Sequence, residues 1–266
     1  MRDLQKKHTF VVCAYKESPY LEECIISLKK QSCKSSIIMI TSTPNKYISE
    51  LAEKYNIKLI INTGEGGIVQ DWNFGYKQCN TPYITIAHQD DVYFTKYAER
   101  AVEHMEKSKK PLIYFSDYCE IRNGKRVSNN TLLKVKRLLL LPLRIKFLQR
   151  SRFIRRRSLS LGSAICCPAV TFAAENLPET VFTVHFRSCE DWEAWERISK
   201  MKGEFVYEPK ILMGHRIHEG SETSIIIGDN ARSKEDYEMF CKFWPKWIAK
   251  ILIKFYSKSQ ESNKIN

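Results

Sequence analysis

The stretch PYITIAHQDDVY, residues 82–93, begins as an apolar run and breaks into His, Gln and two Asp before apolar character returns. A short apolar run bounded by polar residues is typical of a buried strand. Asp90 and Asp91 therefore follow the carboxyl end of such a strand. A carboxylate buried there costs free energy unless a partner binds it, so the pair raises the question of what it holds.

Apolar runs alternate with amphipathic segments through the first 95 residues of the chain. The expected strands are 8–15, 35–42, 57–62 and 82–88, and the expected helices between them are 20–31, 46–55 and 67–79. This alternation predicts an α/β fold with a Rossmann-like, mainly parallel sheet flanked by helices. In such sheets ligands bind beyond the carboxyl ends of the strands, where the two carboxylates are expected.

After residue 95 the alternation is less regular. The Asn123-Gly124 pair predicts a tight hairpin, and Pro245 predicts a bend in a long amphipathic helix near the end of the chain. The expected elements are a helix at 95–108, a basic amphipathic insert at about 130–157, a helix at 188–202, a strand pair at 203–218 and the C-terminal helix at 234–256.

The bulk composition is that of a globular protein. Of 266 residues, 43% are hydrophobic and 12% aromatic, well outside the disordered range. The nine cysteines are an odd number without zinc-finger spacing. The opening residues MRDLQKKHTF have no long apolar core, so we expect no signal peptide and reduced thiols in the cytoplasm.

The positive charge is concentrated in one segment. The chain has 43 Lys and Arg against 30 Asp and Glu, and thirteen of the basic residues lie between Ile121 and Ala174, where no acidic residue occurs. The remaining chain is therefore balanced, with 43 minus 13, or 30, basic residues against 30 acidic ones. The excess charge is a local feature of the basic insert and its flanks.

The basic insert predicts contact with an anionic membrane surface. Residues 132–157 mix ten Lys or Arg with Leu, Ile and Phe, and the apolar run LLLLPL is too short to span a bilayer. A basic amphipathic helix lies in the plane of the membrane interface, and each cation near an anionic surface adds about 1 kcal/mol. A solvated basic face is the alternative. We expect no nucleic-acid partner, because the cations alternate with aliphatic rather than stacking side chains.

The C-terminal helix allows two interpretations. Its segment FWPKWIAKILIKFY carries Trp244 and Trp247, and tryptophan favours the headgroup zone of a membrane. An amphipathic helix that packs its apolar face on the domain would show the same pattern.

The two carboxylates also allow two interpretations. Adjacent carboxylates in a cleft form a hard oxygen site suited to Mn²⁺ or Mg²⁺, which often complete their shell with substrate phosphate. Alternatively, Asp90 and Asp91 cap the helix that begins near Thr95.

Four motifs occur in an order that resembles the inverting family 2 glycosyltransferases of the GT-A fold. They are VVCAYKESPYLEECIISLKKQ from residue 11, NTGEGGIVQDWNFGYKQCNTPYITIAHQDDVY from residue 62, EDWEAW from residue 190 and HRIHEGSETS from residue 215. The resemblance covers roughly residues 8 to 225. It implies a GT-A-like domain at 1–232, with a nucleotide-binding half at 1–95 and an acceptor half at 96–232, followed by a C-terminal amphipathic helix and tail at 233–266.

The resemblance implies the donor-site residues. Ala14, Tyr15 and Glu17 would cradle the base and ribose of the nucleotide. Asp91 would bind the metal, with Asp90 near the ribose or the metal.

The resemblance also implies the catalytic residues and the loop that closes the site. Asp191 would be the catalytic base with Glu190 beside it, and His218 would close over the diphosphate or the metal. Ser188 and Asp191 also have the spacing of a helix capping box, and the two roles can coexist. The segment 162–172 lies where the family builds part of its acceptor site.

Three positions depart from the family pattern. His88 stands where the first carboxylate of the acidic element is expected, and Trp72 stands where an arginine is expected before Asn73. Thr41 and Ser42 replace the acidic pair often found after the second strand, and Thr41 is the expected nucleotide contact there. Because Trp72 replaces the arginine, Asp71 or another group must serve in that corner of the nucleotide site.

The implied function is metal-dependent transfer of a sugar from a nucleotide-diphosphate donor, a UDP-sugar by expectation, to a hydroxyl of a cell-surface glycan or lipid-linked saccharide. We expect the protein to be peripheral on the cytoplasmic face of the cell membrane. One alternative is a catalytically silent membrane adaptor with the same fold. Another is a sugar nucleotidyltransferase, which would need a Gly-rich loop after the first strand, whereas AYKESPY has no glycine.

Overall fold

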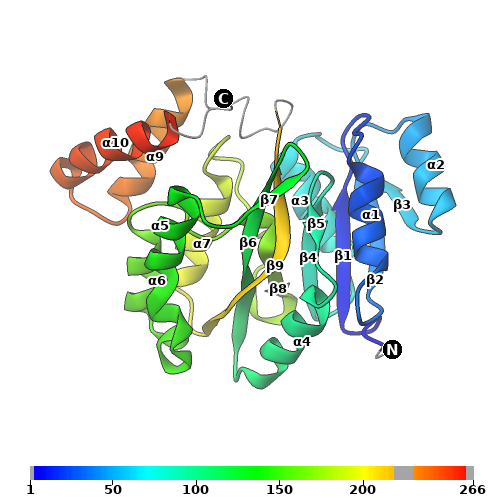
Figure 1. The fold of residues 1–266 in the computed structure, drawn as a ribbon, viewed down its shortest axis with the longest axis horizontal. Helices are drawn as coiled ribbons and strands as arrows, with labels where there is room; N and C mark the ends of the chain where they lie inside the picture. Colours follow the sequence, from blue (N-terminus) through cyan, green and yellow to red (C-terminus); the bar gives the residue numbers. More distant parts are fainter. Residues whose placement is uncertain (1–2, 219–229, 262–266) are drawn as a thin grey trace.

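The first part of the chain forms four parallel strands joined by helices, as the alternation predicts. The structure is a computed structural model that describes residues 3–218 and 230–261 (Figure 1). The strands are β1 (His8–Cys13), β2 (Ser36–Thr41), β3 (Lys58–Ile61) and β4 (Tyr83–His88), joined by α1 (Leu21–Lys29), α2 (Lys46–Lys54) and α3 (Ile68–Lys77). β1 pairs in parallel with β2 and β4, and β2 with β3, so their carboxyl ends share one edge of the sheet.

The second part of the chain extends the same sheet. Its elements are β5 (Val92–Tyr93), α4 (Tyr97–Lys107), β6 (Pro111–Arg122), β7 (Lys125–Val127), β8 (Val170–Ala173), α7 (Glu190–Ser199) and β9 (Glu204–Ile217). The strand order is β3-β2-β1-β4-β8-β6-β9-β5, with β7 beside β6. The short strand β8, which the sequence analysis did not predict, runs antiparallel to both β4 and β6 and so joins the two parts.

The hairpin between β6 and β7 is confirmed. Asn123 and Gly124 have φ values of 49° and 74°. A two-residue turn with positive φ at both positions matches the twist of the strands that it connects.

The predicted strand pair at 203–218 is wrong, because the segment is the single long strand β9. It runs parallel to β6, but Ser116 pairs with Glu208 and the next residue, Asp117, pairs with Ile211. Pro209 and Lys210 are therefore extra residues of a bulge, and both are exposed. Proline has no backbone N–H to donate to the ladder. It is tolerated at a bulge because the extra residues there are not paired with the neighbouring strand.

The basic insert is not one helix. It folds as α5 (Thr131–Leu140) and α6 (Arg152–Leu159), joined by two 3₁₀ turns at Leu141–Arg144 and Lys146–Arg150. Pro142 lies in the first of these turns. The side chains of Asn130 and Ser151 accept hydrogen bonds from the first turns of the two helices, which fixes where each helix begins.

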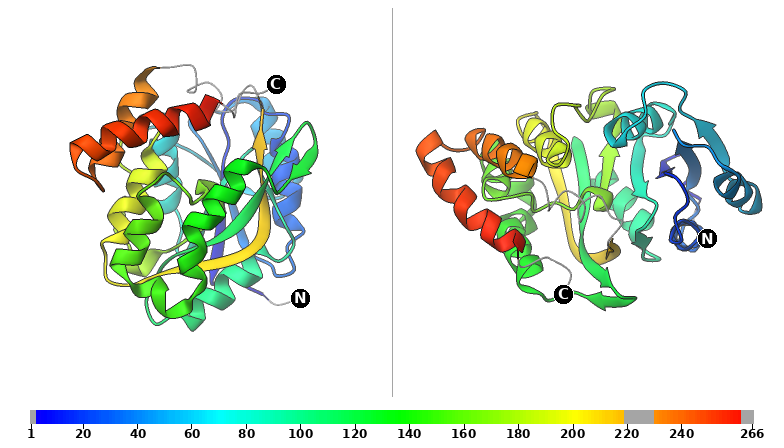
Figure 2. Two further views of the ribbon diagram at one scale, coloured as in Figure 1. Left: turned by 60° about the vertical axis from the view of Figure 1, so that its left-hand side comes forward. Right: turned by 90° about the horizontal axis from the view of Figure 1, so that it is seen from above.

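The C-terminal helix breaks at Pro245 instead of bending. The two pieces are α9 (Asn230–Cys241) and α10 (Lys246–Glu261), and they lie at the end of the molecule farthest from β3 (Figures 1 and 2). Among the described residues, no helix has both the length and the apolar character needed to cross a bilayer.

Alternating side chains of the central strands build two apolar layers. Phe10 and Val12 of β1 face the layer that contains α1, α2 and α4, whereas Val11 faces the layer that contains α3 and α7. This second layer also holds Phe240 of α9 and Ala249 of α10, both at most 1% exposed. The C-terminal helices are therefore part of the main core.

Candidate active site

Asp91 lies in the turn between β4 and β5 and is fully buried. Its Oδ1 accepts hydrogen bonds from the backbone N–H of Arg216, at 2.8 Å, and from Nδ1 of His215, at 3.1 Å. Both donors belong to the end of β9. The acidic turn predicted from the sequence is thus completed by a strand more than 120 residues away.

Asp90 faces His218, with Oδ2 and Nε2 3.0 Å apart. Burial raises the pKa of Asp90, but the hydrogen bond from His218 and the nearby rings of His88 and His215 lower it by more. The net shift is downward, so Asp90 is ionised at neutral pH. Of the three predicted metal ligands, Asp90 and Asp91 share the acidic turn, and His218 contacts Asp90.

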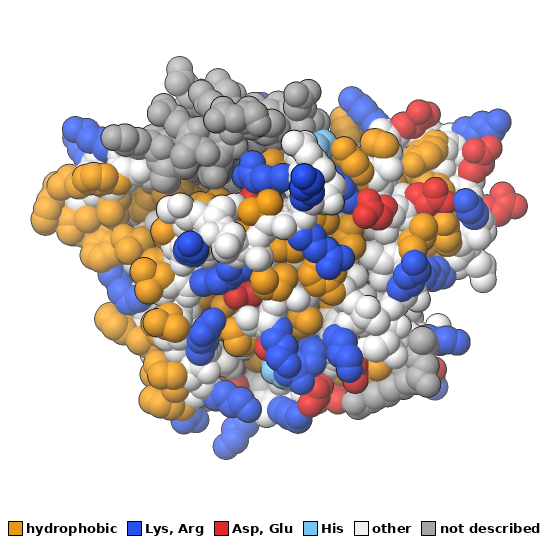
Figure 3. Space-filling view, in the orientation of Figure 1, with side chains coloured by type: hydrophobic (Ala, Val, Ile, Leu, Met, Phe, Trp, Pro, Cys, Tyr) orange, Lys and Arg blue, Asp and Glu red, His pale blue; other side chains and the backbone are white. Residues whose placement is uncertain are grey.

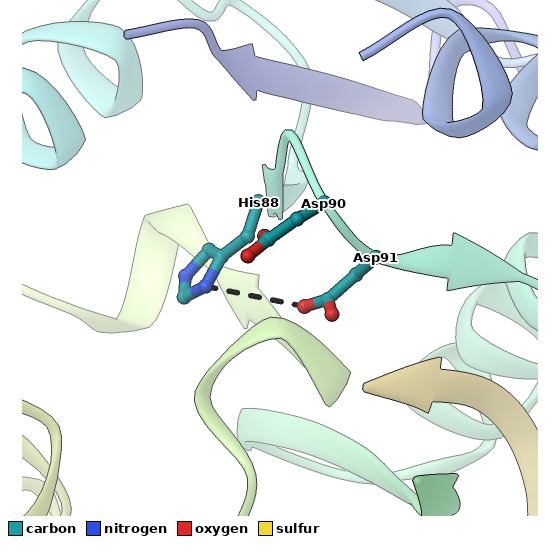
Figure 4. A group of neighbouring side chains, drawn as sticks. All are labelled: His88, Asp90 and Asp91. Carbon is teal, nitrogen blue, oxygen red and sulfur yellow. Dashed lines mark ion pairs between the residues drawn. The ribbon is translucent and has the colours of Figure 1, made fainter. Parts of the chain in front are cut away.

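His88 joins the two carboxylates. Ligand atoms of His88, Asp90 and Asp91 all lie within 4.8 Å of one another, and Nδ1 of His88 is 4.0 Å from Oδ2 of Asp91 (Figure 4). Burial lowers the pKa of His88, and the two carboxylates offset this only in part. The imidazole is therefore neutral, which is the form that binds metal ions. The sequence analysis did not predict His88 as a metal ligand. Its position in the acidic element, where a carboxylate is expected, is the signal that could have identified it as a candidate.

Two of the departures from the family pattern contact each other. The indole of Trp72 stacks on the ring of His88, with centroids 5.0 Å apart and planes at 17°. Trp72 in turn packs on Phe182. The tryptophan thus holds the imidazole against the acidic turn.

The residues present fit a divalent ion. Nε2 of His88 is buried and has no hydrogen-bond partner among the described residues. Two carboxylates and a neutral imidazole supply oxygen and nitrogen ligands of the kind that Mn²⁺ accepts, whereas Mg²⁺ prefers an all-oxygen set. A ligand set that includes an imidazole nitrogen favours Mn²⁺ over Mg²⁺.

Arg216 fixes the acidic turn from the side of β9. Its Nε donates to the carbonyl oxygen of Asp90 at 2.8 Å, and its guanidinium pairs with Glu23 of α1 and lies 4.3 Å from the ring centroid of Tyr20. Burial lowers the pKa of the adjacent His215, but Asp91 raises it by more, so the net shift is upward. The sequence analysis did not assign Arg216 or His215, although both lie in the HRIH motif.

The loop after β1 contacts the acidic turn through Gln89. Its side-chain oxygen accepts from the backbone N–H of Tyr15 at 2.9 Å, and its amide donates to the carbonyl of Tyr15 at 3.1 Å. Of the predicted nucleotide ligands in this loop, Ala14 is buried, whereas Tyr15 and Glu17 are exposed. Gln89, which the sequence analysis did not assign, therefore holds Tyr15 beside the candidate metal site.

The other predicted nucleotide residues lie where β2 and β3 end. Asp71, in the first turn of α3, accepts from Ser42 at 2.6 Å and from Asn62 at 2.7 Å. Thr41 is fully buried, and its hydroxyl accepts from the backbone N–H of Thr43 at 3.0 Å. Both residues thus shape the loops at this edge of the sheet.

Asp191 lies in the first turn of α7. Its Oδ2 accepts from the hydroxyl of Ser163 at 3.3 Å, and its Oδ1 accepts from the backbone N–H of Trp192 at 2.5 Å. The capping box with Ser188 is not formed, because the N-cap residue of α7 is Cys189 and no side chain caps the helix, whereas the hydroxyl of Ser188 donates to Glu235 of α9. Burial raises the pKa of Asp191, and Lys136 is the main charge that opposes the shift.

The neighbours of Asp191 on α7 are buried. Glu190 is 8% exposed, and Trp192 and Trp195 are at most 1% exposed. The two tryptophans are core residues.

The buried thiol of Cys166 is influenced by both carboxylate centres. Burial raises its pKa well above the ordinary value, and the charges of Asp91 and Asp191 both add to the shift.

The chain is similar to known glycosyltransferases in sequence and in fold. The family model described as glycosyl transferase family 2 matches residues 9–171. No curated protein sequence matches the chain significantly.

Among solved structures, the chain is similar to residues 1–349 of TarS from S. aureus. The identity is 13%, with 93% of this chain and 69% of that chain covered and a TM-score of 0.56. The same TarS fragment in complex with UDP-GlcNAc gives 15% identity, 93% and 70% coverage and a TM-score of 0.57. The chain is also similar to the mannosyltransferase PcManGT from Pyrobaculum calidifontis in complex with GDP-Man and Mn²⁺. The identity is 13%, with 93% of this chain and 69% of that chain covered and a TM-score of 0.59. At these identities the likeness establishes the fold, which is GT-A-like.

Proposed function

Because the chain belongs to glycosyl transferase family 2, we propose that it is an inverting, metal-dependent glycosyltransferase that uses a UDP-sugar as its donor. One observation carries most of the proposal: His88, Asp90 and Asp91 converge in the turn after β4, at the edge of the sheet where the parallel strands end. Solved relatives bound to UDP-GlcNAc and to GDP-Man with Mn²⁺ add support for a nucleotide-sugar donor.

The acidic turn is the proposed donor site. His88, Asp90 and Asp91, with His218 beside them, would hold the ion. A bound Mn²⁺ or Mg²⁺ would supply positive charge next to the departing diphosphate. The β1 loop residues Ala14, Tyr15 and Glu17 would bind the nucleoside. Thr41 and Asp71 would shape the other side of that pocket, and residues 1–95 would thus be the nucleotide-binding half.

Asp191 is the proposed base. The acceptor hydroxyl loses its proton to the Asp191 carboxylate while its oxygen bonds to the anomeric carbon of the sugar. The bond from that carbon to the diphosphate breaks in the same step, so the anomeric configuration inverts. Ser163, which contacts Asp191, belongs to the segment 162–172, where we place part of the acceptor site. Glu190 supports the turn that carries the base.

The proposed acceptor is a hydroxyl of a cell-surface glycan or a lipid-linked saccharide, reached from the cytoplasmic face of the membrane. The surface formed by α5, α6 and α10 supports membrane contact, because hydrophobic side chains gather there among Lys and Arg (Figure 3). We call it the apolar platform, and its exposed members are Val135, Leu138, Leu141, Ile145, Phe147, Phe153, Trp247, Ile251 and Phe255.

The helix α10 shows why the platform favours a membrane over solvent. Its inner face packs on the core through Ala249, while a second apolar row points outward at every fourth residue: Trp247, Ile251 and Phe255. Lys246, Lys250 and Lys254 form an exposed row directly beside it. An exposed apolar row next to a cationic row is the pattern of a helix that lies in a membrane interface.

Only part of the basic insert is available to lipid. Lys134, Arg144, Lys146, Arg150 and Arg152 are exposed. The other five cations of residues 132–157 contact groups of the protein itself: Lys136, Arg137, Arg155, Arg156 and Arg157. At about 1 kcal/mol each, the five exposed cations together with the three lysines of α10 suffice for peripheral binding.

The donor is tested by a thermal-shift panel of UDP- and GDP-sugars with and without Mn²⁺, since a ligand that binds only the folded state raises its apparent stability. The expected result is stabilisation by a UDP-sugar that requires Mn²⁺. Hydrolysis of that donor, followed by proton NMR of the first sugar anomer formed, tests inversion. A protein that binds no nucleotide sugar and hydrolyses none would instead support the membrane-adaptor alternative.

A further inference from the structure

Lys136 is one of the cations of the basic insert that contact the protein itself. Its ammonium donates to the hydroxyl of Tyr118 at 3.0 Å and lies 5.4 Å from the centroid of that ring. It lines a small cavity with Ala164 and Ile165. Lys134, two residues earlier on α5, is exposed.

The position of Lys136 connects the two halves of the candidate site. The ring of Tyr118 packs edge-on against His215 at 6.2 Å, and His215 binds Asp91. On the other side, the cavity residue Ala164 directly follows Ser163, which contacts Asp191. The ammonium therefore lies between the candidate metal ligands and the candidate base.

The electrostatics agree with this placement. Lys136 is the charge that most favours the ionised form of Asp191.

Lys136 has no carboxylate partner within 4.0 Å among the described residues, unlike its neighbour Arg137, which pairs with Asp117. A half-buried ammonium whose hydrogen bond goes to a neutral phenol is incompletely compensated. Such a group gains most when an anion of the substrate binds beside it.

We propose that Lys136 binds the diphosphate of the nucleotide donor, on the side opposite the metal ligands. This inference rests on the proposed function. When the bond to the anomeric carbon breaks, negative charge grows on the leaving phosphate, and a fixed ammonium stabilises that charge. Lysine suits this role because its ammonium is a compact point charge of the kind that binds phosphate groups.

The test is calorimetric titration of UDP, and of uridine as the probe without phosphate, in the presence of Mn²⁺. Lys136→Met is compared with wild type and with Lys134→Met, which removes an exposed lysine from the same helix. We expect Lys136→Met to weaken UDP binding by about 10- to 100-fold, with uridine binding unchanged. Lys134→Met should bind both as wild type does. Lys136→Arg keeps the charge and should retain most of the UDP affinity, which guards against a folding defect in the Met variant.

The outcomes separate this inference from the function on which it rests. If the wild type binds neither UDP nor GDP with Mn²⁺, the proposed function and the role of Lys136 both fail. If the wild type binds UDP and Lys136→Met binds it equally well, only the role of Lys136 fails. Equal loss of UDP and uridine affinity would also overturn the role, because it would mean that Lys136 supports the fold. If Lys136→Met binds UDP as the wild type does but has a raised KM for an anionic acceptor, Lys136 contacts the acceptor and its role at the diphosphate fails.

Discussion

The carboxylate of Asp91 accepts a hydrogen bond from the backbone N–H of Arg216 at 2.8 Å, across 125 residues of sequence. Because β9 returns to the acidic turn in this way, its end also brings His215 and His218 to the two carboxylates. The candidate metal site is therefore held by both parts of the sheet, and changes at either part should affect it.

Asp91→Asn should abolish Mn²⁺-dependent nucleotide binding. The amide keeps the shape of the side chain but loses the charge and one lone-pair site for the ion. We expect UDP affinity in Mn²⁺ to fall by at least about 100-fold, to the level seen without metal, as measured by calorimetry. Glu50→Gln is the matched control, since it removes an exposed carboxylate on α2 and should bind as wild type does. Retained Mn²⁺ dependence in Asp91→Asn would show that the ion binds elsewhere.

Asp191→Asn should remove the base but leave donor binding intact. We expect kcat to fall by about 10²–10⁴-fold while the affinity for UDP stays within about twofold of wild type. Steady-state kinetics on donor hydrolysis and UDP titration measure the two quantities. A mild loss of kcat would mean that Asp191 only stabilises the first turn of α7.

The pH profile should depend on Lys136. Asp191 must be ionised to act as a base, and burial raises its pKa above the ordinary value, so the rate should fall on the acid side at a higher pH than that of a free aspartate. The groups that lower this pKa are Lys136 of α5, the N–H of Trp192, Arg232 of α9 and Ser163. Lys136→Met removes the largest of these charges, so the acid limb of kcat should move further to higher pH. An acid limb in the same place in both proteins would contradict this electrostatic coupling.

Glu235→Gln should disturb the base without affecting the donor site. Glu235 of α9 accepts from the backbone N–H groups of Arg187 and Ser188 at 2.9 and 2.8 Å, and so fixes the turn that leads into α7. We expect kcat to fall about tenfold with an unchanged UDP affinity. Glu238→Gln, on the same helix, is the control, because its contact with His185 lies at the surface. A rise in the Kd of UDP with constant kcat would argue against positioning of Asp191.

Arg155→Met should cost about 2–4 kcal/mol of unfolding free energy. Arg155 is fully buried, and its guanidinium donates to the carbonyl oxygens of Met201 and Gly203, both at 2.7 Å. Methionine would leave these carbonyls without donors. Arg152→Met, at an exposed position of the same helix, should change stability by less than about 0.5 kcal/mol in urea unfolding. Similar values for the two variants would contradict the structural role of Arg155.

The double variant Trp247→Ser/Ile251→Ser should weaken binding to liposomes that contain anionic lipid. Both side chains belong to the outward row of α10, and loss of their burial in the interface should reduce sedimentation at least about tenfold. Ile61→Ser is the control, because Ile61 is 46% exposed on β3, at the other end of the sheet. Binding of the wild type that does not depend on lipid charge would refute the electrostatic part of the membrane proposal.

The sequence predicted best what depends on local pattern. The four parallel strands and the hairpin at Asn123 and Gly124 are confirmed, since periodicity and turn chemistry determine them. The GT-A-like fold, which the family resemblance implied, is also confirmed. The sequence did not reveal β8, because four residues between antiparallel neighbours carry too short a pattern. It also suggested a turn within β9, where a bulge accommodates Pro209.

The residues missed at the site are those whose role depends on tertiary contact. His215 and Arg216 reach Asp91 only because β9 lies beside β5. Lys136 was counted with the surface cations, and its inward direction depends on how α5 packs over Tyr118. His88 was visible as a departure from the family pattern, but its stacking on Trp72 and its position beside Asp90 and Asp91 are seen only in the structure.

Whether the acidic turn holds a divalent ion at the donor diphosphate is tested by anomalous diffraction from crystals grown with Mn²⁺ and UDP. We expect a manganese peak bound by His88, Asp90 and Asp91, with diphosphate oxygens completing its shell. A nucleotide bound elsewhere, or a manganese peak that none of these three side chains contacts, would contradict it.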